Sequence, residues 1–254
     1  MLRLEGKSAL LVGTKRVGRR VAMRLAVEGV NMTIAYRSSK SEADRLHEQL
    51  MPISDRVVLV QGDVSVEEDV ERMVNLATET MGSLSFVVNL ASDFPRTPLE
   101  SLDSKSWDNA MVTAKGSYLL AVHSARRMAV NQGPTRGHIV FFSDWAAMET
   151  PYREYLPYLT SKAAIDFMTR AFAMELAPNG ILVNAIAPGP TMRPPQISEE
   201  VWQKDVLDQA PLRRESSADD IAELIVTLLK SETITGETVR VDSGRHLAGP
   251  GSAG

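Results

Sequence analysis

The sequence predicts a single doubly wound α/β domain built on a parallel sheet. Short apolar runs rich in β-branched residues alternate with longer amphipathic stretches, which is the pattern of repeated βα units. The 254 residues contain no linker, repeat or change of composition that would mark a domain boundary. Candidate ligand-binding residues follow the apolar runs directly, and in doubly wound sheets ligands bind beyond the carboxyl ends of the strands. These three observations together define the fold class.

The first half of the chain divides into four strands and the helices between them. The expected strands cover residues 8–13, 32–36, 57–61 and 86–91. The expected helices cover residues 17–28, 42–51 and 65–82. In the first helix Val21 and Leu25 face inward, and Gly29 ends the helix. The third helix is expected to open with a capping box at Ser65-Val66-Glu67-Glu68 and to end at Gly82.

The second half continues the alternation with longer helices. The expected helices cover residues 106–130, 158–176 and 218–230, and the expected strands cover residues 139–143, 182–187 and 238–241. The Pro/Gly-rich loop at 188–195 opens a segment, residues 190–215, that we interpret as a lid over the substrate. Residues 248–254 are interpreted as a flexible tail.

Composition excludes several classes of function. A formal net charge of −4 does not favour binding to nucleic acid or to an anionic membrane. The chain has no cysteine, which excludes disulfides, thiolate zinc sites and thiol catalysis. Its four histidines show no metal-ligand spacing, so no metal site is expected. No signal-peptide core or long apolar run is present, which predicts a soluble, cytoplasmic protein.

Tyr158 and Lys162 form the candidate catalytic pair. In a helix the two side chains rise from one face, because positions i and i+4 lie one above the other. An ammonium beside a phenol stabilises the phenolate and lowers the pKa of the tyrosine, which can then exchange a proton nearer neutral pH. Such a tyrosine is a general acid for an atom next to a carbon that receives hydride. The spacing also occurs on solvated helix faces, so the neighbouring motifs decide between the two interpretations.

The turn Gly13-Thr14-Lys15-Arg16-Val17-Gly18 follows the first strand and opens a helix. Glycine permits a tight turn there, and free N–H groups with the helix dipole suit a pyrophosphate, so we expect a dinucleotide. After the second strand, Arg37 with Ser38 or Ser39 stands where an NAD site carries a carboxylate. These groups suit the 2′-phosphate of NADP(H), and the alternative is a solvated loop with a capping serine.

Four motifs lie in order at the ends of the expected strands: Gly13…Gly18, Asn89-Leu90-Ala91-Ser92, Tyr158-x-x-x-Lys162 and Pro188-Gly189. Together they resemble the short-chain dehydrogenase/reductase family from Gly6 to about His246. The resemblance implies a single Rossmann-type domain whose seven-stranded parallel sheet has the order 3-2-1-4-5-6-7, with helices on both faces. It also implies a nicotinamide cofactor, Tyr158 as acid/base, Lys162 on the nicotinamide ribose, and a homodimer or homotetramer formed through the two long helices. By this resemblance the cofactor-binding residues are Gly13, Thr14, Lys15, Arg16, Val17, Gly18, Arg37, Ser38, Ser39, Asp63, Val64, Asn89, Ala91, Ser92, Tyr158, Lys162, Pro188 and Gly189.

Asp63 follows the third strand and has two interpretations. Its carboxylate is expected either to accept a hydrogen bond from the adenine amino group or to form a turn before Ser65.

The chain departs from the family pattern in the motifs that hold the cofactor and the relay water. Val12 replaces a threonine before the first glycine, and Arg16 stands near the middle glycine in a turn that is one residue shorter. Leu90 and Ser92 replace an asparagine and a glycine after the fourth strand. The active-site asparagine of the family aligns best with Thr113.

The catalytic serine that follows the fifth strand in the family also differs. Ser143 lies one residue early and Asp144 stands at the position of the serine, so either side chain is a candidate for its role. With Arg16 and Phe94, this aspartate resembles the pteridine reductase branch, which includes dihydromonapterin and dihydrofolate reductases. The resemblance implies that Phe94 stacks on a pterin ring and that Asp144 assists proton delivery through Tyr158. The alternatives are that Phe94 packs beneath the loop 95–98 and that Asp144 is a turn residue beside an active Ser143.

The remaining substrate residues are expected to be Trp145, Tyr155 and Met192. Trp145 forms the floor of the substrate pocket or fills a gap under the next loop, and Tyr152 and Tyr155 line the pocket. The predicted activity is NADP(H)-dependent hydride transfer to a C=N or C=O bond of a pterin-like small molecule. The alternatives are a carbonyl or 3-oxoacyl reductase and a catalytically weak NADP-binding sensor.

Overall fold

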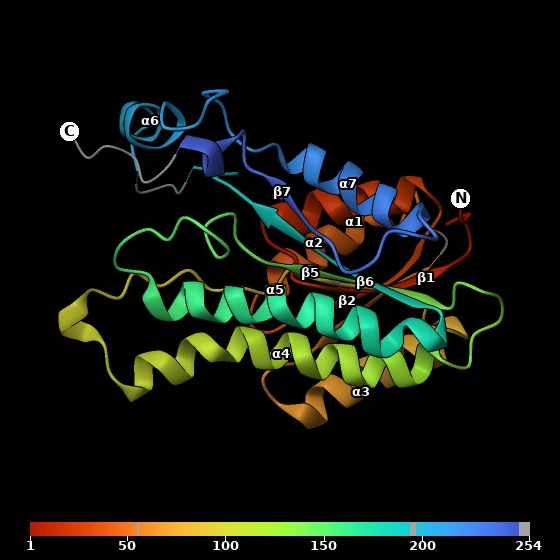
Figure 1. Cartoon of the computed structure of the whole chain (residues 1–254). Helices are drawn as coiled ribbons and strands as arrows, with labels where there is room; N and C mark the ends of the chain where they lie inside the picture. Colours follow the sequence, from red (N-terminus) through yellow and green to blue (C-terminus); the bar gives the residue numbers. More distant parts are fainter. Residues whose placement is uncertain (55, 194–196, 249–254) are drawn as a thin grey trace.

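The structure is a computed structural model that describes residues 1–54, 56–193 and 197–248 (Figure 1). Its strands are β1 (Ser8–Val12), β2 (Asn31–Tyr36), β3 (Val57–Gln61), β4 (Phe86–Asn89), β5 (Gly137–Phe142), β6 (Ile181–Pro188) and β7 (Thr238–Val241). Its α-helices are α1 (Val17–Val27), α2 (Lys40–Leu50), α3 (Glu67–Met81), α4 (Ser104–Met128), α5 (Leu156–Leu176), α6 (Glu199–Trp202) and α7 (Ala218–Lys230). Single turns are η1 (Leu99–Ser101), η2 (Ala177–Asn179), η3 (Gln203–Leu207) and η4 (Arg245–Ala248).

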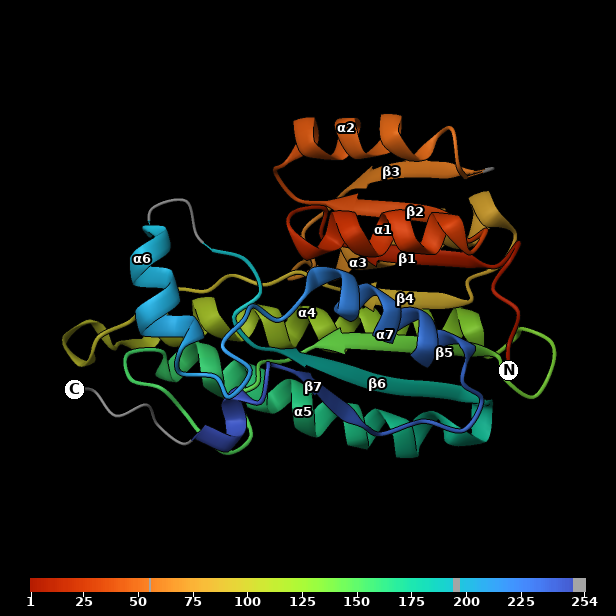
Figure 2. The ribbon, with the colours of Figure 1, turned by 90° about the horizontal axis from the view of Figure 1, so that it is seen from above.

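All seven strands run parallel in the order β3-β2-β1-β4-β5-β6-β7. The order reverses between β1 and β4, which is the switch point where doubly wound sheets open a crevice for ligands. Both the predicted fold class and the strand order are therefore confirmed. The carboxyl ends of the strands, the segment around α6 and the turn η4 lie together on the left in Figures 1 and 2.

Two layers of helices cover the sheet, as Figure 1 shows. α1, α2 and α7 pack on one face around Leu25, Ile34 and Ile225, all of which are fully buried. α3, α4 and α5 pack on the other face around Met73, Leu120 and Ile165, which are also fully buried. Strands buried on both faces explain the continuous apolar runs in the sequence.

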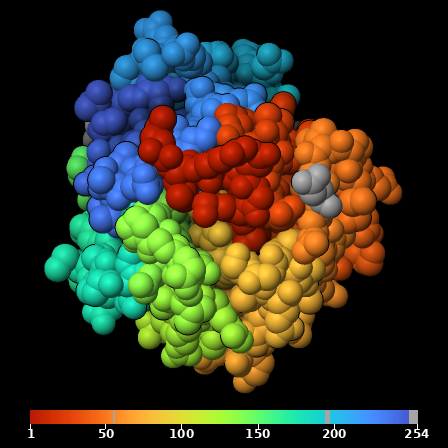
Figure 3. All heavy atoms as spheres, turned by 90° about the vertical axis from the view of Figure 1, so that its right-hand side faces the viewer, coloured from red at the N-terminus to blue at the C-terminus, as the bar shows by residue number. Residues whose placement is uncertain are grey.

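The amino ends of the strands lie on the right in Figures 1 and 2, and Figure 3 shows the molecule from that side. The N-terminal residues, red in Figure 3, lie beside the blue segment that follows α7. The amide of Leu2 donates to the carbonyl of Lys230 at 2.9 Å, which ties the start of the chain to the end of α7.

Most predicted boundaries agree with the structure within about two residues, and α7 and β7 agree fully. The predicted capping box at Ser65 is wrong. α3 begins after Val66, which makes no side-chain cap, because the Ser65 hydroxyl donates to Asp63 Oδ1 at 2.7 Å. Gly82 does end α3, in the left-handed conformation.

The segment interpreted as a lid contains the short helix α6 and the turn η3. α6 is capped by Ser198 and continues into the turn η3, and Trp202 is buried against the rest of the chain. Residues 194–196, which include Pro194 and Pro195, lie outside the described residues, as does the expected tail beyond Ala248.

Candidate active site

The loop after β5 and the first turn of α5 bring Asp144 and Tyr158 into direct contact. The Tyr158 hydroxyl donates to Asp144 Oδ2 at 2.8 Å, and the Tyr152 hydroxyl donates to the same oxygen at 3.3 Å. The amide of Ala146 donates to Asp144 Oδ1 at 2.9 Å, which fixes the carboxylate. α5 begins at Leu156, with Pro157 in its first turn, where proline is compatible with a helix. The structure therefore joins the two residues that the sequence places fourteen positions apart.

Lys162 lies one helical turn after Tyr158 and is buried. Its Nζ donates to the carbonyl of Phe142, the last residue of β5, at 2.8 Å and lies 5.7 Å from the centre of the Tyr158 ring. The predicted shared face of the helix is therefore present. The hydrogen bond to Phe142 ties the Lys162 ammonium of α5 to the end of β5.

Burial dominates the electrostatics of this pair. The pKa of Tyr158 is raised well above its usual value by burial and by the neighbouring Asp144, which is opposite to the direction expected from Lys162 alone. Burial also raises the pKa of Asp144 and lowers the pKa of Lys162 to about 8. Tyr158 is consequently held in its protonated form.

Ser143 does not face the Tyr158 hydroxyl. Its own hydroxyl contacts the carbonyl oxygen of Lys162 at 3.3 Å and is buried. Successive residues of an extended chain point to opposite sides, so Asp144 faces Tyr158 while Ser143 faces the body of α5. Of the two candidates for the serine position, Asp144 is the one in contact with Tyr158.

An aromatic cluster, formed by Phe94, Trp145, Tyr152, Tyr155 and Tyr158, surrounds the phenol. The Phe94 ring stacks on Tyr155 with centroids 4.4 Å apart and meets Tyr158 edge-on at 4.9 Å. Phe94 is nevertheless 57% exposed, so an apolar face beside the phenol is open to a ligand. Its ring packs on these tyrosines, which the alternative of packing beneath residues 95–98 does not explain.

Trp145 fills the inner end of the aromatic cluster. It is 8% exposed, its ring centre lies 5.9 Å from that of Tyr152, and the Arg245 guanidinium lies 5.1 Å above it. This arrangement fits a packed floor. The contribution of Arg245 was not predicted, because the sequence carries no signal that η4 folds back over the loop after β5.

The glycine turn has the geometry that close approach of a ligand requires. Gly13 has φ 103°, and a Cβ on Gly18 would lie 2.1 Å from the Gly13 carbonyl oxygen, so no larger residue fits at Gly18. Lys15 and Arg16 are exposed, Thr14 and Gly18 are buried, and Val17 begins α1 with no acidic residue in its first turn. This cradle at a helix N-terminus fits a pyrophosphate.

Arg16 occupies a left-handed conformation with φ 53° and donates from Nη2 to the carbonyl of Met192. The glycine turn is therefore connected to the segment interpreted as a lid. Met192 itself is partly exposed.

The ends of β2 and β3 surround an open depression of about 470 Å³ lined by Arg37, Gln61, Gly62, Asp63, Asp69 and Arg72. Arg37 lies 3.9 Å from Asp63 Oδ2 and 3.6 Å from Asp93 Oδ2, and its side chain is mostly exposed. Ser38 is exposed, and the Ser39 hydroxyl lies 3.5 Å from that of Thr14. Ser39 precedes α2 without forming a side-chain cap, so the capping alternative is not what the structure contains.

Asp63 forms the turn before Ser65, as one of its two interpretations predicts. Its Oδ1 accepts hydrogen bonds from the Ser65 amide at 2.9 Å and from the Ser65 hydroxyl at 2.7 Å. Its Oδ2 lies 3.9 Å from the Arg37 guanidinium.

Asn89 organises the end of β4. Its Oδ1 accepts from the amide of Ala91 at 3.2 Å, and its Nδ2 donates to the Ser117 hydroxyl at 3.0 Å. Ser117 in turn donates to the carbonyl of Thr113 at 3.0 Å, and Ser92 is exposed. The residue that aligns with the active-site asparagine of the family therefore has its carbonyl engaged by α4 itself.

Three further predicted residues, Val64, Pro188 and Gly189, lie in tightly packed segments. Val64 packs on Gly116 of α4, where a Cβ would lie 2.6 Å from a Val64 methyl group. After β6, the Pro188 carbonyl accepts from the Trp145 amide at 3.2 Å, and a Cβ on Gly189 would lie 2.7 Å from Asp242 Cα. The loop after β6 must therefore contain glycine to pass β7.

Within residues 1–54, 56–193 and 197–248, no group of three histidine, aspartate or glutamate side chains is arranged to hold a metal ion. No helix in those same ranges is both long and apolar enough to cross a membrane.

Comparison with known proteins finds relatives over nearly the whole chain. The family described as "Enoyl-(Acyl carrier protein) reductase" matches residues 13–246. The 3-oxoacyl-[acyl-carrier-protein] reductase FabG of Staphylococcus aureus is 30% identical over 247 residues, which is 95% of this chain and 98% of the relative.

Solved structures share the fold over the whole domain. A short-chain dehydrogenase from Burkholderia cenocepacia in complex with NADP has a TM-score of 0.87 at 27% identity and covers 96% of this chain and 99% of its own. FolM alternative dihydrofolate reductase 1 from Brucella canis, complexed with NADP, has a TM-score of 0.86 at 27% identity and covers 97% of this chain and 96% of its own. With its glycine turn, its Tyr158–Lys162 pair and these relatives, the chain belongs to the short-chain dehydrogenase/reductase family and is an oxidoreductase of that family.

Proposed function

We propose that the protein is an NADPH-dependent reductase that transfers hydride to a C=N or C=O bond of a planar, pterin-like heterocycle. The observation that carries the proposal is the 2.8 Å contact between the Tyr158 hydroxyl and Asp144 beside the exposed ring of Phe94. A carboxyl at this position can take part in proton transfer, which a serine hydroxyl does less well. Phe94 offers a planar ring an aromatic face within reach of the phenol.

The cofactor fits the residues that are present. The Gly13–Gly18 cradle suits the pyrophosphate, and the exposed Arg37 with Ser38 and Ser39 suits a 2′-phosphate. Two similar structures are complexed with NADP, which supports NADP over NAD here. When bound, the reduced nicotinamide supplies the hydride. Lys162 would hold the nicotinamide ribose.

The proton reaches the substrate through Tyr158. As hydride arrives at the carbon of a C=N bond, the Tyr158 hydroxyl gives its proton to the nitrogen, and the nearby Lys162 ammonium stabilises the phenolate that remains. Asp144 lies at hydrogen-bond distance from the phenol oxygen, and in its protonated form it returns a proton to Tyr158. The raised pKa of Asp144, caused by burial, makes this form accessible at a higher pH than for an exposed aspartate.

A second candidate function is reduction of a ketone or 3-oxoacyl thioester. The specific observation in its favour is the 30% identity to the FabG relatives, which are named as 3-oxoacyl-[acyl-carrier-protein] reductases. In that case Asp144 or Ser143 orients the carbonyl, and Phe94 has only a packing role.

We also propose that residues 190–215 act as the lid and that α4 and α5 face a second subunit in a homodimer or homotetramer. The contact between Arg16 and Met192 supports the lid, because it joins this segment to the cofactor turn. Large apolar side chains support the interface: Tyr118 of α4 and Phe167 and Met174 of α5 are exposed in the single chain.

The test is NADPH oxidation by the purified protein with dihydrobiopterin, dihydrofolate, a 3-oxoacyl thioester and a set of ketones, and with NADH run in parallel. We expect turnover of a pterin with NADPH, and a loss of at least about 100-fold in kcat for Tyr158→Phe, which cannot donate the proton. Phe94→Leu should raise KM for the pterin and leave turnover of a simple ketone unchanged.

Other outcomes contradict the proposal at defined points. Turnover of ketones or thioesters alone would replace the pterin with the second candidate. Preference for NADH would remove the role given to Arg37. NADPH binding at one equivalent per chain without turnover on the whole panel would favour the weakly catalytic sensor.

A further inference from the structure

α5 carries a second acidic residue, Asp166, one helical turn after Lys162. The two side chains share a helix face because they are four residues apart. Asp166 is only 3% exposed, neither of its carboxylate oxygens has a hydrogen bond of good geometry within the described residues, and the hydroxyls of Ser143 and Thr238 lie near it. Burying a carboxylate with such weak partners is unfavourable. A residue of this kind in the middle of the active-site helix therefore calls for a functional explanation.

The groups that face Asp166 come from three elements. Ser143 from the loop after β5 and Thr238 from β7 present hydroxyls, and Lys162 and Arg170 from α5 itself present positive charges. These four groups favour the ionised carboxylate, and burial opposes it and raises the pKa of Asp166. This arrangement agrees with the orientation of Ser143, whose hydroxyl points toward α5 near Asp166 and away from the Tyr158 hydroxyl.

Lys162 is 2% exposed and is faced by two carboxylates, Asp144 and Asp166. Asp144 is already engaged by Tyr158, by Tyr152 and by the amide of Ala146. Its protonation state also changes if it takes part in proton transfer. In the proposed mechanism Asp144 is neutral while it carries the proton that it returns to Tyr158, so a buried ammonium whose sole counter-charge were Asp144 would have no counter-charge in that state.

We propose that Asp166 is a positioning residue whose buried carboxylate keeps the Lys162 ammonium charged while Asp144 exchanges protons. The second carboxylate separates two tasks: Asp144 serves Tyr158, and Asp166 serves Lys162. The consequence for catalysis rests on the role proposed above for Lys162. The ionisation of Lys162 does not, so it can be measured without cofactor or substrate.

The experiment is a ¹³Cε-lysine NMR titration of the ligand-free protein, with the Lys162 resonance assigned by its absence in Lys162→Met. In the wild type the titration midpoint of Lys162 is expected below that of ordinary lysines, near its pKa of about 8. In Asp166→Asn, which keeps the shape of the side chain and removes its charge, we expect the midpoint to fall by about one pH unit or more.

The matched control is Ser161→Ala. Ser161 is buried on the same helix beside Lys162, and its hydroxyl has no hydrogen-bond partner among the described residues. This variant removes a buried polar group without changing charge, and the midpoint of Lys162 should stay at the wild-type value. An unchanged midpoint in Asp166→Asn, or an equal fall in Ser161→Ala, would overturn the proposal.

A second measurement uses the wild-type protein and therefore does not depend on whether an Asp166 variant folds. The ¹³Cγ resonance of Asp166 in the wild-type protein must show an ionised carboxylate at pH 7, and a protonated carboxyl would overturn the proposal. Once a substrate is known, the basic limb of the kcat profile should move to lower pH in Asp166→Asn, with KM for the substrate little changed. A purely structural role would reduce activity equally across the pH range.

Discussion

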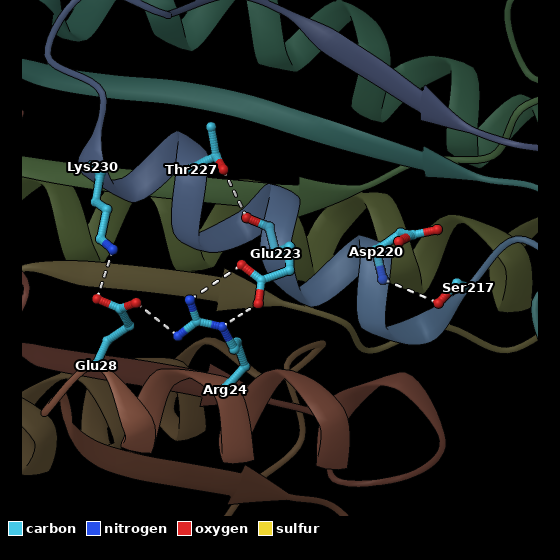
Figure 4. Close-up of polar contacts among 7 residues, drawn as sticks. All are labelled: Arg24, Glu28, Ser217, Asp220, Glu223, Thr227 and Lys230. Carbon is cyan, nitrogen blue, oxygen red and sulfur yellow. Dashed lines mark hydrogen bonds and ion pairs between the residues drawn. The ribbon is translucent and has the colours of Figure 1, made fainter.

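The seam between α1 and α7 and the corner around Tyr158 both gather charged side chains, but in different surroundings. At the seam, Arg24 pairs with Glu28 at 2.7 Å and with Glu223, and Lys230 pairs with Glu28 at 2.7 Å (Figure 4). These side chains are partly exposed, and the neighbouring charges and hydrogen bonds move the pKa of each carboxylate down and that of Arg24 up. Every shift at the seam thus favours the charged form.

At the corner the shifts go the other way. Burial raises the pKa of Asp144 and Asp166 and lowers that of Lys162, so each group is pushed toward its neutral form. Charges in such a place weaken the fold, and they persist where chemistry needs them. The comparison indicates that the seam serves stability, and the shifts at the corner agree with the catalytic role proposed for it.

Asp144→Asn gives the largest expected effect and is the most direct way to break this comparison. The amide can still accept the hydrogen bond from Tyr158 but cannot exchange a proton, so we expect kcat to fall at least about 100-fold. The folded-state pKa of Asp144 is raised, so the folded state binds more protons than the unfolded state, and the penalty is present at pH 7. Removing the charge should therefore raise the free energy of unfolding by on the order of 1 kcal/mol.

Steady-state kinetics and urea denaturation at pH 7 measure both quantities on the same protein. Asp220→Asn is the matched control, because Asp220 is an exposed residue in the first turn of α7. It should leave kcat unchanged. Loss of stability together with activity in Asp144→Asn would show that the corner also holds the fold together.

His138 sharpens the comparison, because it is buried like the corner but lies at the amino ends of the strands. Neither of its ring nitrogens has a hydrogen-bond partner within the described part of the chain, and burial, with a smaller effect of Lys7, lowers its pKa to about 4. The unfolded state, with a pKa near 6.5, therefore binds more protons between these values, and stability is lost as pH falls through this window. Between pH 7 and pH 5 the loss from this residue should be about 2 kcal/mol.

The measurement is urea denaturation at both pH values for the wild type and for His138→Phe, with His47→Gln as the half-buried control. The difference in stability between pH 7 and pH 5 should shrink in His138→Phe and stay as in the wild type in His47→Gln. An unchanged difference in both variants would mean that His138 is protonated in the folded state. If the prediction holds, a strongly shifted pKa by itself does not identify a functional site.

Local sequence patterns were sufficient for the fold class and for most helices and strands, and the order of the strands followed from the family resemblance. The apolar runs and glycine stops predicted the strands, and Tyr158 and Lys162 were placed correctly on one helix face, because both rules depend on residues near in sequence. The capping box at Ser65 failed for a local reason as well, since Asp63 competes for the same hydroxyl. Two overlapping polar motifs cannot be ranked from sequence alone.

The electrostatics of the site could not be predicted in the same way. Lys162-x-x-x-Asp166 has the spacing of an ordinary exposed helix ion pair, and the packing of α5 against α4, β5 and β6 buries it. The lysine rule also gave the wrong direction for the pKa of Tyr158, because it omits burial and Asp144. Such effects depend on contacts between residues distant in the chain.

Arg24→Gln gives the smallest expected effect and tests the seam. The variant removes the charge that joins Glu28 of α1 to Glu223 of α7, while Ser217 still caps α7 and Lys230 still pairs with Glu28 (Figure 4). Because these side chains are partly exposed, screening by solvent limits the loss of stability to about 1 kcal/mol or less. The loss should shrink further in 1 M salt, because the Debye screening length falls to about 3 Å and the attraction between exposed charges weakens. Urea denaturation at low and high salt measures this loss of stability, and kcat should remain at the wild-type value.

A loss of stability that is independent of salt would mean that the Arg24 side chain stabilises the seam by packing. A fall in kcat would show that the two regions are coupled through the sheet.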